Sequence, residues 1–401
     1  MLKNCKRSRR SLLTTNGVIA FDRTVLIPAD KRSAEKLKEL EGDDARSVVP
    51  LDIYLGIDQL PFKVSEPLME EICFFAIRSS SYQEAEDEIR RIYGLHISDD
   101  TVRKIVNWAG KIVFDADCRD AAEKMLTLEN GDFKVSRDLD GVLYLETDGA
   151  ALPTRLKNED GSVWRENKLG IAFTSDTLIK WRSRKDGQAR CRIGRREYVS
   201  FIGAAEDFRR HFFALAVRNG YGRYRETVLI SDGATWIRNL KEMIFPDAQQ
   251  ILDLFHLKEN VGKFALFVFK SDPKKAGEVA DRWCQMLEDG RSSEVLSELS
   301  PYKDKKVPKG IVNLHTYLVN NRDNIDYPAY RAKGYFVGSG AIESANKSVI
   351  QARMKLVGMR WNITTAQYVA SLRAKERSGL WHSVVCRLLR NAVSYQRTST
   401  D

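Results

Sequence analysis

The chain has 401 residues, of which 43% are hydrophobic and 30% are charged, and its formal net charge is +10. This length exceeds one ordinary hydrophobic core and predicts two or three domains, while the composition excludes a disordered or fibrous protein. No apolar stretch approaches the roughly 18 residues that span a bilayer, so we expect no membrane partner.

The six cysteines are scattered along the chain and form no Cys-x-x-Cys pair. This spacing argues against a zinc ribbon or a disulfide framework and favours reduced thiols. The N-terminus is basic but has no apolar segment typical of a signal peptide. We therefore expect a cytoplasmic protein.

The positive charge is concentrated in two segments. Residues 151–225 hold 17 Lys and Arg against 8 Asp and Glu, and residues 344–401 hold 10 against 2. Segregated basic charge predicts a polyanionic partner, most often nucleic acid. The alternative is a solvated basic surface without a specific partner.

Residues 1–66 are expected to form a small β-containing arm and a linker. The stretch 17–27, GVIAFDRTVLI, fits a strand of a hairpin, whereas the stretch 31–47 is polar and expected to be exposed.

Residues 67–125 follow a helical pattern. Gly94 is expected to end one helix, and Ser98 is a good N-cap for the next. Two helices joined by a short turn that contains glycine form a helix-turn-helix pattern, in which the second helix can enter the major groove of DNA. Arg103 and Lys104 would then be reading residues. The alternative is an ordinary helical hairpin, because two aspartates begin this helix and disfavour a close approach to phosphates.

From residue 139 the pattern changes to strands. Three strand candidates (GVLYLET, NKLGIAFT and REYVSFI) precede a helix, a fourth strand (TVLIS), a second helix and a fifth strand (QQILDL). The order βββαβαβ predicts an α/β sheet whose last two strands are parallel.

The sheet domain is expected to be interrupted. Residues 139–256 form its first part, residues 257–336 follow a helical pattern and are expected to form an all-helical insertion, and residues 337–380 return to the sheet domain. Residues 381–401 form a basic tail.

Two phrases of the sequence repeat each other. VLYLETDGAA and VLISDGATWI each place Asp-Gly-Ala after an apolar strand. With a right-handed crossover, the first and fourth strands can be parallel neighbours in the middle of the sheet. Asp148 and Asp232, each expected to end its strand, would then lie side by side at one edge, where ligand sites of α/β sheets are found.

Two close carboxylates repel each other unless a cation compensates their charge, and Mg²⁺ or Mn²⁺ suits such oxygen ligands. Glu343, in GSGAIESANK, is the best third carboxylate, because it lies in the first turn of a predicted helix. Three carboxylates can hold two ions about 3.5–4 Å apart for phosphoryl transfer. The simpler alternatives are common Asp-Gly turns and a surface glutamate stabilised by the helix dipole.

A family resemblance rests on the same residues. YLETDGA, WRENKLG, ISDGATWI, DLFH and GSGAIESANKSVIQARMKLVGMRW together resemble bacterial insertion-sequence transposases of the DDE type, over residues from about 50 to 375. The resemblance implies an RNase H-like catalytic domain with a helical insertion, and it implies a catalytic and metal-binding triad of Asp148, Asp232 and Glu343. Asp253 and His256, in DLFH, match a D-x-x-H signature that lies beside the active site in related transposases.

Eight residues are candidates for contacts to DNA: Arg103, Lys104, Lys168, Lys347, Arg353, Lys355, Arg360 and Trp361. Arg353 and Lys355 are predicted to form a phosphate clamp, unless they belong to a solvated helix face. Trp361 either packs in the interior or stacks on a flipped or frayed base.

The resemblance implies a transposase that binds double-stranded DNA at element ends, as a homodimer or higher oligomer in the bacterial nucleoid, and that performs Mg²⁺-dependent cleavage and strand transfer. One alternative is a non-catalytic DNA-binding protein that descends from a transposase, and another is an RNase H-like nuclease or resolvase. An aspartyl-phosphate phosphatase is disfavoured, because that chemistry uses Asp-x-Asp and residue 150 is alanine.

Overall fold

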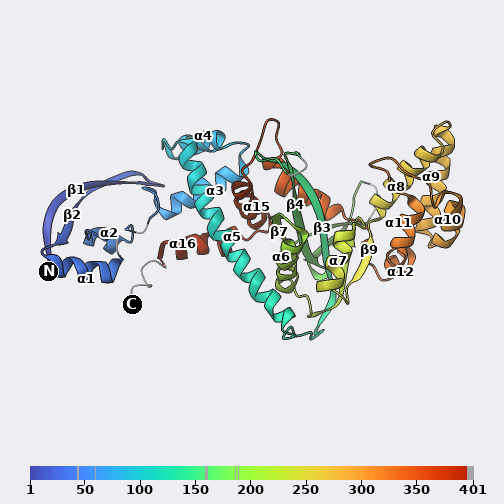
Figure 1. Cartoon of the computed structure of the whole chain (residues 1–401), viewed down its shortest axis with the longest axis horizontal. Coiled ribbons are helices and arrows are strands. Elements are labelled where there is room, and N and C mark those ends of the chain that lie inside the picture. Colours follow the sequence, from blue (N-terminus) through green and yellow to red (C-terminus); the bar gives the residue numbers. More distant parts are fainter. Residues whose placement is uncertain (43–44, 59, 159–160, 186, 188, 395–401) are drawn as a thin grey trace. The chain divides into compact units, whose positions relative to one another are not determined.

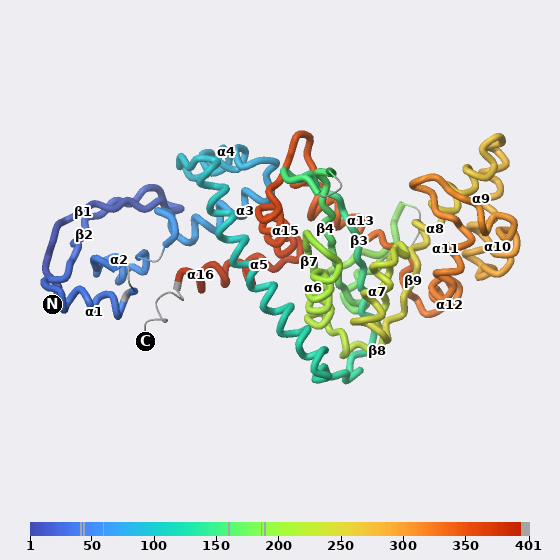
Figure 2. Tube along the Cα trace, viewed as in Figure 1, coloured from blue at the N-terminus to red at the C-terminus, as the bar shows by residue number. Residues whose placement is uncertain are grey.

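The computed structural model describes residues 1–42, 45–58, 60–158, 161–185, 187 and 189–394 (Figures 1 and 2). The predicted basic tail, 381–401, is therefore described as far as residue 394, and residues 395–401 lie outside the described part. The chain divides into two compact units. Unit 1 contains Met1–Asp117, Pro153–Leu156 and the chain from Val349 onward, and unit 2 contains Cys118–Leu152 and Lys157–Ser348.

Unit 1 begins with an antiparallel hairpin of two strands, β1 (Leu2–Thr14) and β2 (Gly17–Pro28). The predicted strand 17–27 is thus confirmed. The polar stretch after the hairpin contains a helix, α1 (Lys31–Glu41), which we did not predict. The carboxylate of Asp30 caps this helix by accepting from the amide of Ser33 at 2.8 Å, so a capped polar helix replaces the expected linker.

The helical pattern after residue 66 is confirmed. Gly94 ends the second of these helices in the left-handed conformation, and the hydroxyl of Ser98 accepts from the amide of Thr101 at 3.3 Å at the start of the third. The helices of unit 1 after α1 are α2 (Pro50–Leu55), α3 (Glu66–Arg78), α4 (Tyr82–Tyr93), the first part of α5 (Asp99–Glu129), α14 (Ala352–Met354), α15 (Ile363–Arg377) and α16 (Arg387–Ser394).

Unit 2 is built on a mixed five-stranded sheet in the order β7-β4-β3-β8-β9. Its strands are β3 (Leu139–Pro153), β4 (Trp164–Thr174), β7 (Glu197–Ile202), β8 (Tyr224–Ser231) and β9 (Gln249–Leu252). β3 pairs with β8 and β8 with β9 in parallel, whereas β4 pairs with β7 antiparallel. The predicted central pair of parallel strands is therefore confirmed, as is the parallel pairing of the last two strands.

Alternation along β3 gives the sheet two different faces. Leu143 and Leu145 point to a hydrophobic core formed with α6 (Ala205–Arg218) and α7 (Thr235–Ile244). Tyr144, between them, points to the opposite face, where its ring stacks on Phe173 at 5.1 Å between centroids. By the same alternation, acidic residues at even positions of β3 lie on the face opposite α6 and α7.

The stretch between the second and third predicted strands contains an additional hairpin of two exposed strands, β5 (Leu178–Arg182) and β6 (Ala189–Ile193). After β9 the chain forms the expected helices: α8 (Leu254–Val268), α9 (Pro273–Glu288), α10 (Ser292–Leu299), α11 (Leu314–Asn320) and α12 (Tyr327–Ala332). α13 (Gly340–Ala345) follows, and a π-helical segment, Asn346–Gln351, continues it. Within the described residues, no helix has the length and apolar character needed to cross a membrane.

One predicted boundary is wrong. Asp148 does not end its strand, because β3 continues to Pro153. What ends near Asp148 is the parallel ladder to β8, whose last pair is Glu146 with Ile230. Asp232, in contrast, follows the last residue of β8 as predicted.

The packing of β4 against α6 yields a stability prediction. A Cβ atom added at Gly170 would lie 2.6 Å from the ring of buried Phe212, whereas one added at Gly277, in α9, would meet nothing within 4 Å. We expect Gly170→Ala to lower the free energy of unfolding by about 1–3 kcal/mol, because overpacking displaces core side chains. Gly277→Ala, the matched control, should raise it by about 0.5–1 kcal/mol. Urea unfolding measures both, and an unaltered midpoint for Gly170→Ala would contradict the packing described.

Candidate active site

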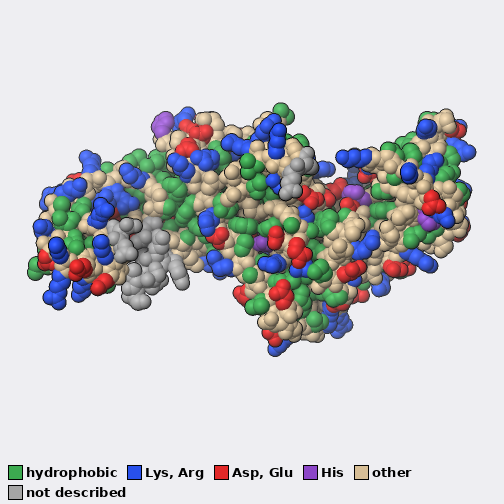
Figure 3. All heavy atoms as spheres, viewed as in Figure 1, with side chains coloured by type: hydrophobic (Ala, Val, Ile, Leu, Met, Phe, Trp, Pro, Cys, Tyr) green, Lys and Arg blue, Asp and Glu red, His purple; other side chains and the backbone are tan. Residues whose placement is uncertain are grey.

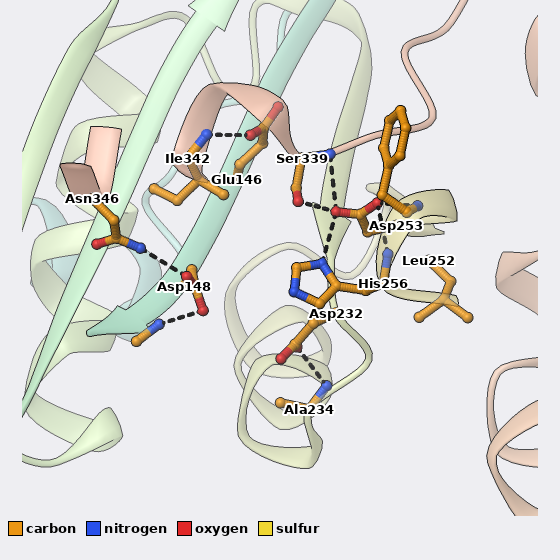
Figure 4. A network of polar contacts seen from close by, with 12 residues as sticks. Glu146, Asp148, Asp232, Ala234, Leu252, Asp253, His256, Ser339, Ile342 and Asn346 are labelled. Atoms are coloured by element: carbon orange, nitrogen blue, oxygen red, sulfur yellow. Dashed lines mark hydrogen bonds and ion pairs between the residues drawn. The ribbon is translucent and has the colours of Figure 1, made fainter. Parts of the chain in front are cut away.

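Three aspartates meet at one edge of the sheet in unit 2. Asp148 lies on β3, Asp232 follows β8, and Asp253 follows β9 (Figure 4). These strands are parallel neighbours, so their carboxyl ends lie at the same edge. Figure 4 shows Asp148 to one side of Asp232, with the ring of His256 next to Asp232.

Two hydrogen bonds orient the carboxylate of Asp148. The amide of Gly149 donates to Oδ1 at 2.7 Å, and the side-chain amide of Asn346 donates to Oδ2 at 2.7 Å. Burial and the negative charge of Asp232 nevertheless raise the pKa of Asp148 above its ordinary value. Asp148 is therefore a fixed carboxylate for which a nearby cation is favourable.

Asp232 is held by a tight turn and by the helical insertion. Its Oδ1 accepts from the amide of Ala234 at 2.9 Å, and its main-chain oxygen accepts from the hydroxyl of Tyr317, in α11, at 2.7 Å. The turn requires glycine at position 233, which has a φ of +82°. At Gly149, where φ is not in the left-handed region, a Cβ atom would instead meet the carboxylate of Glu166, so that side chain would have to shift. The two Asp-Gly phrases thus use glycine for different reasons.

Asp253 is a fully buried acceptor of several hydrogen bonds. Its Oδ1 caps α8 by accepting from the amide of Phe255 at 2.7 Å, and its Oδ2 accepts from the amide of Ser339 at 3.1 Å and also from the Ser339 hydroxyl. Nδ1 of His256 lies 3.0 Å from the same Oδ2. Burial alone would raise the pKa of Asp253, but the hydrogen bonds from His256, Ser339 and Phe255 outweigh it and lower that pKa.

His256 is the cation of the cluster. Its hydrogen bond to Asp253 raises its pKa from 6.5 to about 9, against the opposing effect of burial, and the charges of Asp232 and Asp148 add to the rise. The imidazole is consequently protonated at neutral pH. In this state it offsets part of the negative charge of the surrounding carboxylates.

A fourth acid, Glu146, connects β3 with the segment that carries Glu343. Glu146 is 1% exposed, and its Oε2 accepts from the amide of Ile342 at 2.8 Å. Burial raises its pKa to about 8, so it is mostly protonated at neutral pH. Its hydrogen bond fixes the start of α13, one residue before Glu343.

Glu343 joins the site through Asp253 and His256. The potential ligand atoms of these three side chains all lie within 4.8 Å of one another. The predicted triad of Asp148, Asp232 and Glu343 does not by itself form such a close group among the described residues. The structure therefore brings all five predicted site residues to one edge, and it places Glu343 closest to the DLFH pair.

The cluster suits a hard divalent cation. Its donors are carboxylate oxygens, which fit Mg²⁺ or Mn²⁺, whereas His256 would become a ligand only after losing its proton. Oδ1 of Asn346 is a further oxygen in this region, buried and without a hydrogen-bond partner in the described structure. On the face drawn in Figure 3, acidic side chains gather next to a histidine in the area that Figure 1 gives to β3 and α8. A cation bound there would relieve both their mutual repulsion and the unmet acceptor.

Two of the residues predicted to contact DNA are buried in unit 1. Arg353 is 2% exposed and its Nε donates to the oxygen of Ala76 at 3.2 Å, while Trp361 is 7% exposed and its Nε1 donates to the oxygen of Met354 at 2.9 Å. Arg353 does not form the predicted exposed pair with Lys355, because it points inward from α14 whereas Lys355 follows that helix at the surface.

The other candidates differ in their exposure and in their contacts. Lys168 is 4% exposed in unit 2, where it pairs with Glu166 and donates to the oxygen of Gly203 at 3.0 Å, so its position is structural. Arg103 and Lys104 both pair with Asp100 on the surface of α5. The remaining three are exposed: Lys347, Lys355 and Arg360.

Sequence reasoning missed three polar residues of the site: Glu146, Ser339 and Asn346. Glu146 lies two residues before Asp148, and side chains two residues apart in a strand lie on the same face of the sheet. Asn346 lies one helical turn after Glu343, in the π-helical segment, and such segments are frequent at functional sites. The first signal was readable from the sequence, whereas the π-helical segment and the contact of Ser339 with Asp253 were not.

Fold and site together define a mixed α/β protein with a cluster of acidic side chains around one histidine at the edge of its parallel strands. The chain belongs to an uncharacterised protein family, UPF0236, whose family model matches residues 6–386. A search of curated proteins found no match to the chain. Because the family match includes parts of both units, both belong to the pattern that defines the family.

The His256–Asp253 pair predicts a pH dependence. Since the folded pKa of about 9 lies above the ordinary 6.5, the pair stabilises the folded state fully below pH 6.5, and this stabilisation is lost as the pH rises through about 9.

An NMR titration of the His256 ring should show a midpoint near 9 in metal-free buffer. Added Mg²⁺ should lower the midpoint, because a neighbouring dication disfavours the imidazolium. Asp253→Asn should lower it towards 6.5, whereas Asp207→Asn, exposed on α6, should not. A midpoint near 6.5 in the unaltered protein would refute the pairing.

Proposed function

We propose that the protein is a DNA transposase of the DDE type, which cleaves DNA at the ends of a mobile element and joins the freed 3′-hydroxyl to target DNA. The observation that carries the proposal is the convergence of its acids. Asp148 and Asp232 are 84 positions apart and Glu343 lies a further 111 positions along the chain, yet all three lie around His256. Surface acids without a common role have no reason to converge in this way.

The architecture supports the same reading. A sheet with a parallel central pair carries the first two acids, and the five α-helices α8 to α12 lie between the last strand of that sheet and the segment that carries Glu343. The resemblance implies this arrangement of an RNase H-like core with a helical insertion. Tyr317, from that insertion, holds the main chain of Asp232, so the insertion also contributes to the geometry of the site.

Each residue then has a defined task. Asp148, Asp232 and Glu343 would hold Mg²⁺ or Mn²⁺, which supplies Lewis acidity and an activated nucleophile for phosphoryl transfer when bound. Asn346 and the amide of Gly149 each donate to one oxygen of Asp148, which fixes the carboxylate while each oxygen keeps a lone pair for a metal. Asp253 keeps His256 protonated and oriented, so the imidazolium can donate to an anionic phosphate oxygen or lose its proton to solvent when a metal enters.

Double-stranded DNA is the proposed substrate, and the uneven basic charge supports it. The exposed hairpin β5–β6 belongs to the more basic of the two segments, and its alternating Arg190 and Arg192 are exposed. Cleavage at two element ends requires two active sites, so we propose a homodimer or higher oligomer on DNA, associated with the nucleoid.

Neutral replacements test the acids directly. Asp148→Asn, Asp232→Asn and Glu343→Gln keep shape but remove charge, so each should reduce Mg²⁺-dependent cleavage and joining of element-end DNA on the order of 10³-fold or more. Combining two of them should add little, because residues that act as a unit are not additive. The readout is a gel assay of cleaved and joined products, with binding measured in parallel.

Asp207→Asn serves as the matched control, because it removes one exposed carboxylate of unit 2 outside the cluster and should retain full activity. Cleavage without joining in the unaltered protein would instead indicate an RNase H-like nuclease or resolvase. Binding without either reaction would indicate a non-catalytic DNA-binding protein. A fully active Glu343→Gln variant would refute the catalytic assignment.

A further inference from the structure

Unit 1 contains a pocket of about 360 Å³ that the acidic cluster does not use. Six of the side chains that line it carry the argument: Tyr82, Arg103, Arg155, Arg353, Arg360 and Trp361. All of them belong to unit 1. The volume lies within the range of about 300–1,000 Å³ that small-ligand sites occupy.

The pocket is positively charged. Four arginines line it, and none of its lining residues is an aspartate or glutamate. Asp100 compensates Arg103 from outside the pocket. Within the described part of the chain, no ion pair compensates Arg155, Arg353 or Arg360. An anion would therefore enter a site where three guanidinium charges are available.

Arg353 is the innermost of these charges. It is 2% exposed, and its guanidinium lies over two aromatic rings, 5.1 Å from the centroid of Tyr82 and 5.3 Å from that of Trp361. Its protein hydrogen bonds go to a main-chain oxygen and a methionine sulfur rather than to a carboxylate. The charge of Glu84, an exposed residue of α4, acts on Arg353 without forming an ion pair with it. A buried cation that has no carboxylate in direct contact gains from a ligand that supplies the counter-charge.

The start of α15 adds to the positive potential. Asn362, its N-cap, and Thr365, in its first turn, also line the pocket. The amino-terminal end of a 15-residue helix favours an anion. Tyr82, Met359 and Trp361 provide apolar surface beside the arginines. The pocket thus combines a cationic part for phosphate with an apolar part for a base or sugar.

We propose that this pocket binds one nucleotide unit of DNA, with its phosphate held by Arg353, Arg155 and Arg360. Arginine offers planar, two-pronged donors that match phosphate oxygens, and its neighbouring aromatic rings offer a surface for the base. A nucleotide at a single-stranded end fits such a pocket better than one inside a duplex, because its base is free to leave the stack. The proposal rests on DNA as the partner but not on catalysis.

The test measures binding in the Glu343→Gln background without metal, so cleavage cannot contribute. A duplex oligonucleotide with a single-stranded end that contains 2-aminopurine is titrated with protein, and anisotropy and 2-aminopurine fluorescence are recorded. Arg155→Ala with Arg360→Ala should weaken binding roughly tenfold per arginine, on the scale of a hydrogen bond to a charged group. The slope of log K against log salt should fall by about 0.7 per lost contact to a single strand. The 2-aminopurine signal should change on binding only while the pocket is intact.

Arg387→Ala is the matched control, because Arg387 is exposed in unit 1 and does not line the pocket. Arg353→Met tests the buried charge, and circular dichroism verifies its fold. If that variant does not fold, the two exposed arginines still decide the question. Pocket variants that lose no more affinity than Arg387→Ala would overturn the proposal.

Two further arms identify the source of the phosphate. Inorganic phosphate and dAMP are added as competitors, and both should displace the oligonucleotide only weakly. If dAMP binds more tightly than the oligonucleotide, the pocket serves a free nucleotide and the DNA assignment is overturned. If the unaltered protein does not bind DNA, the proposed function itself is overturned. If it binds DNA and the pocket variants bind equally well, only the proposed role of the pocket is overturned.

Discussion

The parallel pairing of β3 with β8 is the constraint on which the site depends. This pairing aligns Leu145 with Leu229 and Glu146 with Ile230, and it brings two distant aspartates to one edge of the sheet. Its register is fixed by the hydrophobic core, because a shift of one residue would exchange the two faces of β3. Leu145 would then leave the core under α6 and α7, and Glu146 would enter it. Apolar residues that take no part in the chemistry thus determine where the acids point.

Once the acids are together, their charge must be balanced. The free protein uses three means: it protonates Glu146 by burial, it keeps His256 positively charged beside Asp253, and it satisfies Asp253 with the hydroxyl and amide of Ser339. Asp148 has less compensation, since burial and Asp232 both raise its pKa. A divalent cation would therefore be attracted most strongly to the side of the cluster where Asp148 and Asp232 face each other. The imidazolium of His256 would compete with it, which couples metal affinity to pH.

Much of this arrangement was predictable because it follows local rules. Apolar alternation predicted the central strands, and helical periodicity predicted the helices before and after the sheet. The repeated Asp-Gly-Ala phrase pointed to Asp148 and Asp232, although β3 continues past Asp148. The misses have physical causes. A polar stretch formed α1 because Asp30 caps it, and the hairpin β5–β6 is too exposed to show an apolar period.

The interior polar contacts escaped prediction for a different reason. Glu146 meets Ile342 across 196 positions, and Ser339 meets Asp253 across 86, so no local pattern contains either partner. Carboxylates are also usually exposed, so a sequence pattern does not predict a buried one. Burial is tolerated here because the tertiary fold supplies an amide that donates a hydrogen bond to the carboxylate. The residues hardest to predict are therefore those that hold the predicted ones in place.

Among the basic residues, too, the sequence does not show which side chains are buried and paired in the fold. A count of net charge treats all arginines and lysines alike, but the chain buries several of them. Lys375 is 4% exposed and pairs with Asp117, and Lys168 pairs with Glu166, so these cations are already neutralised inside the fold. Arg353 differs, because it is equally buried but has no carboxylate partner in the described structure and lines an open pocket. Burial alone therefore does not show whether a cation stabilises the fold or binds a ligand. The position of its counter-charge must be known as well. By that criterion, the basic segment after residue 344 contributes to an anion site through Arg353 and Arg360, rather than through its total charge.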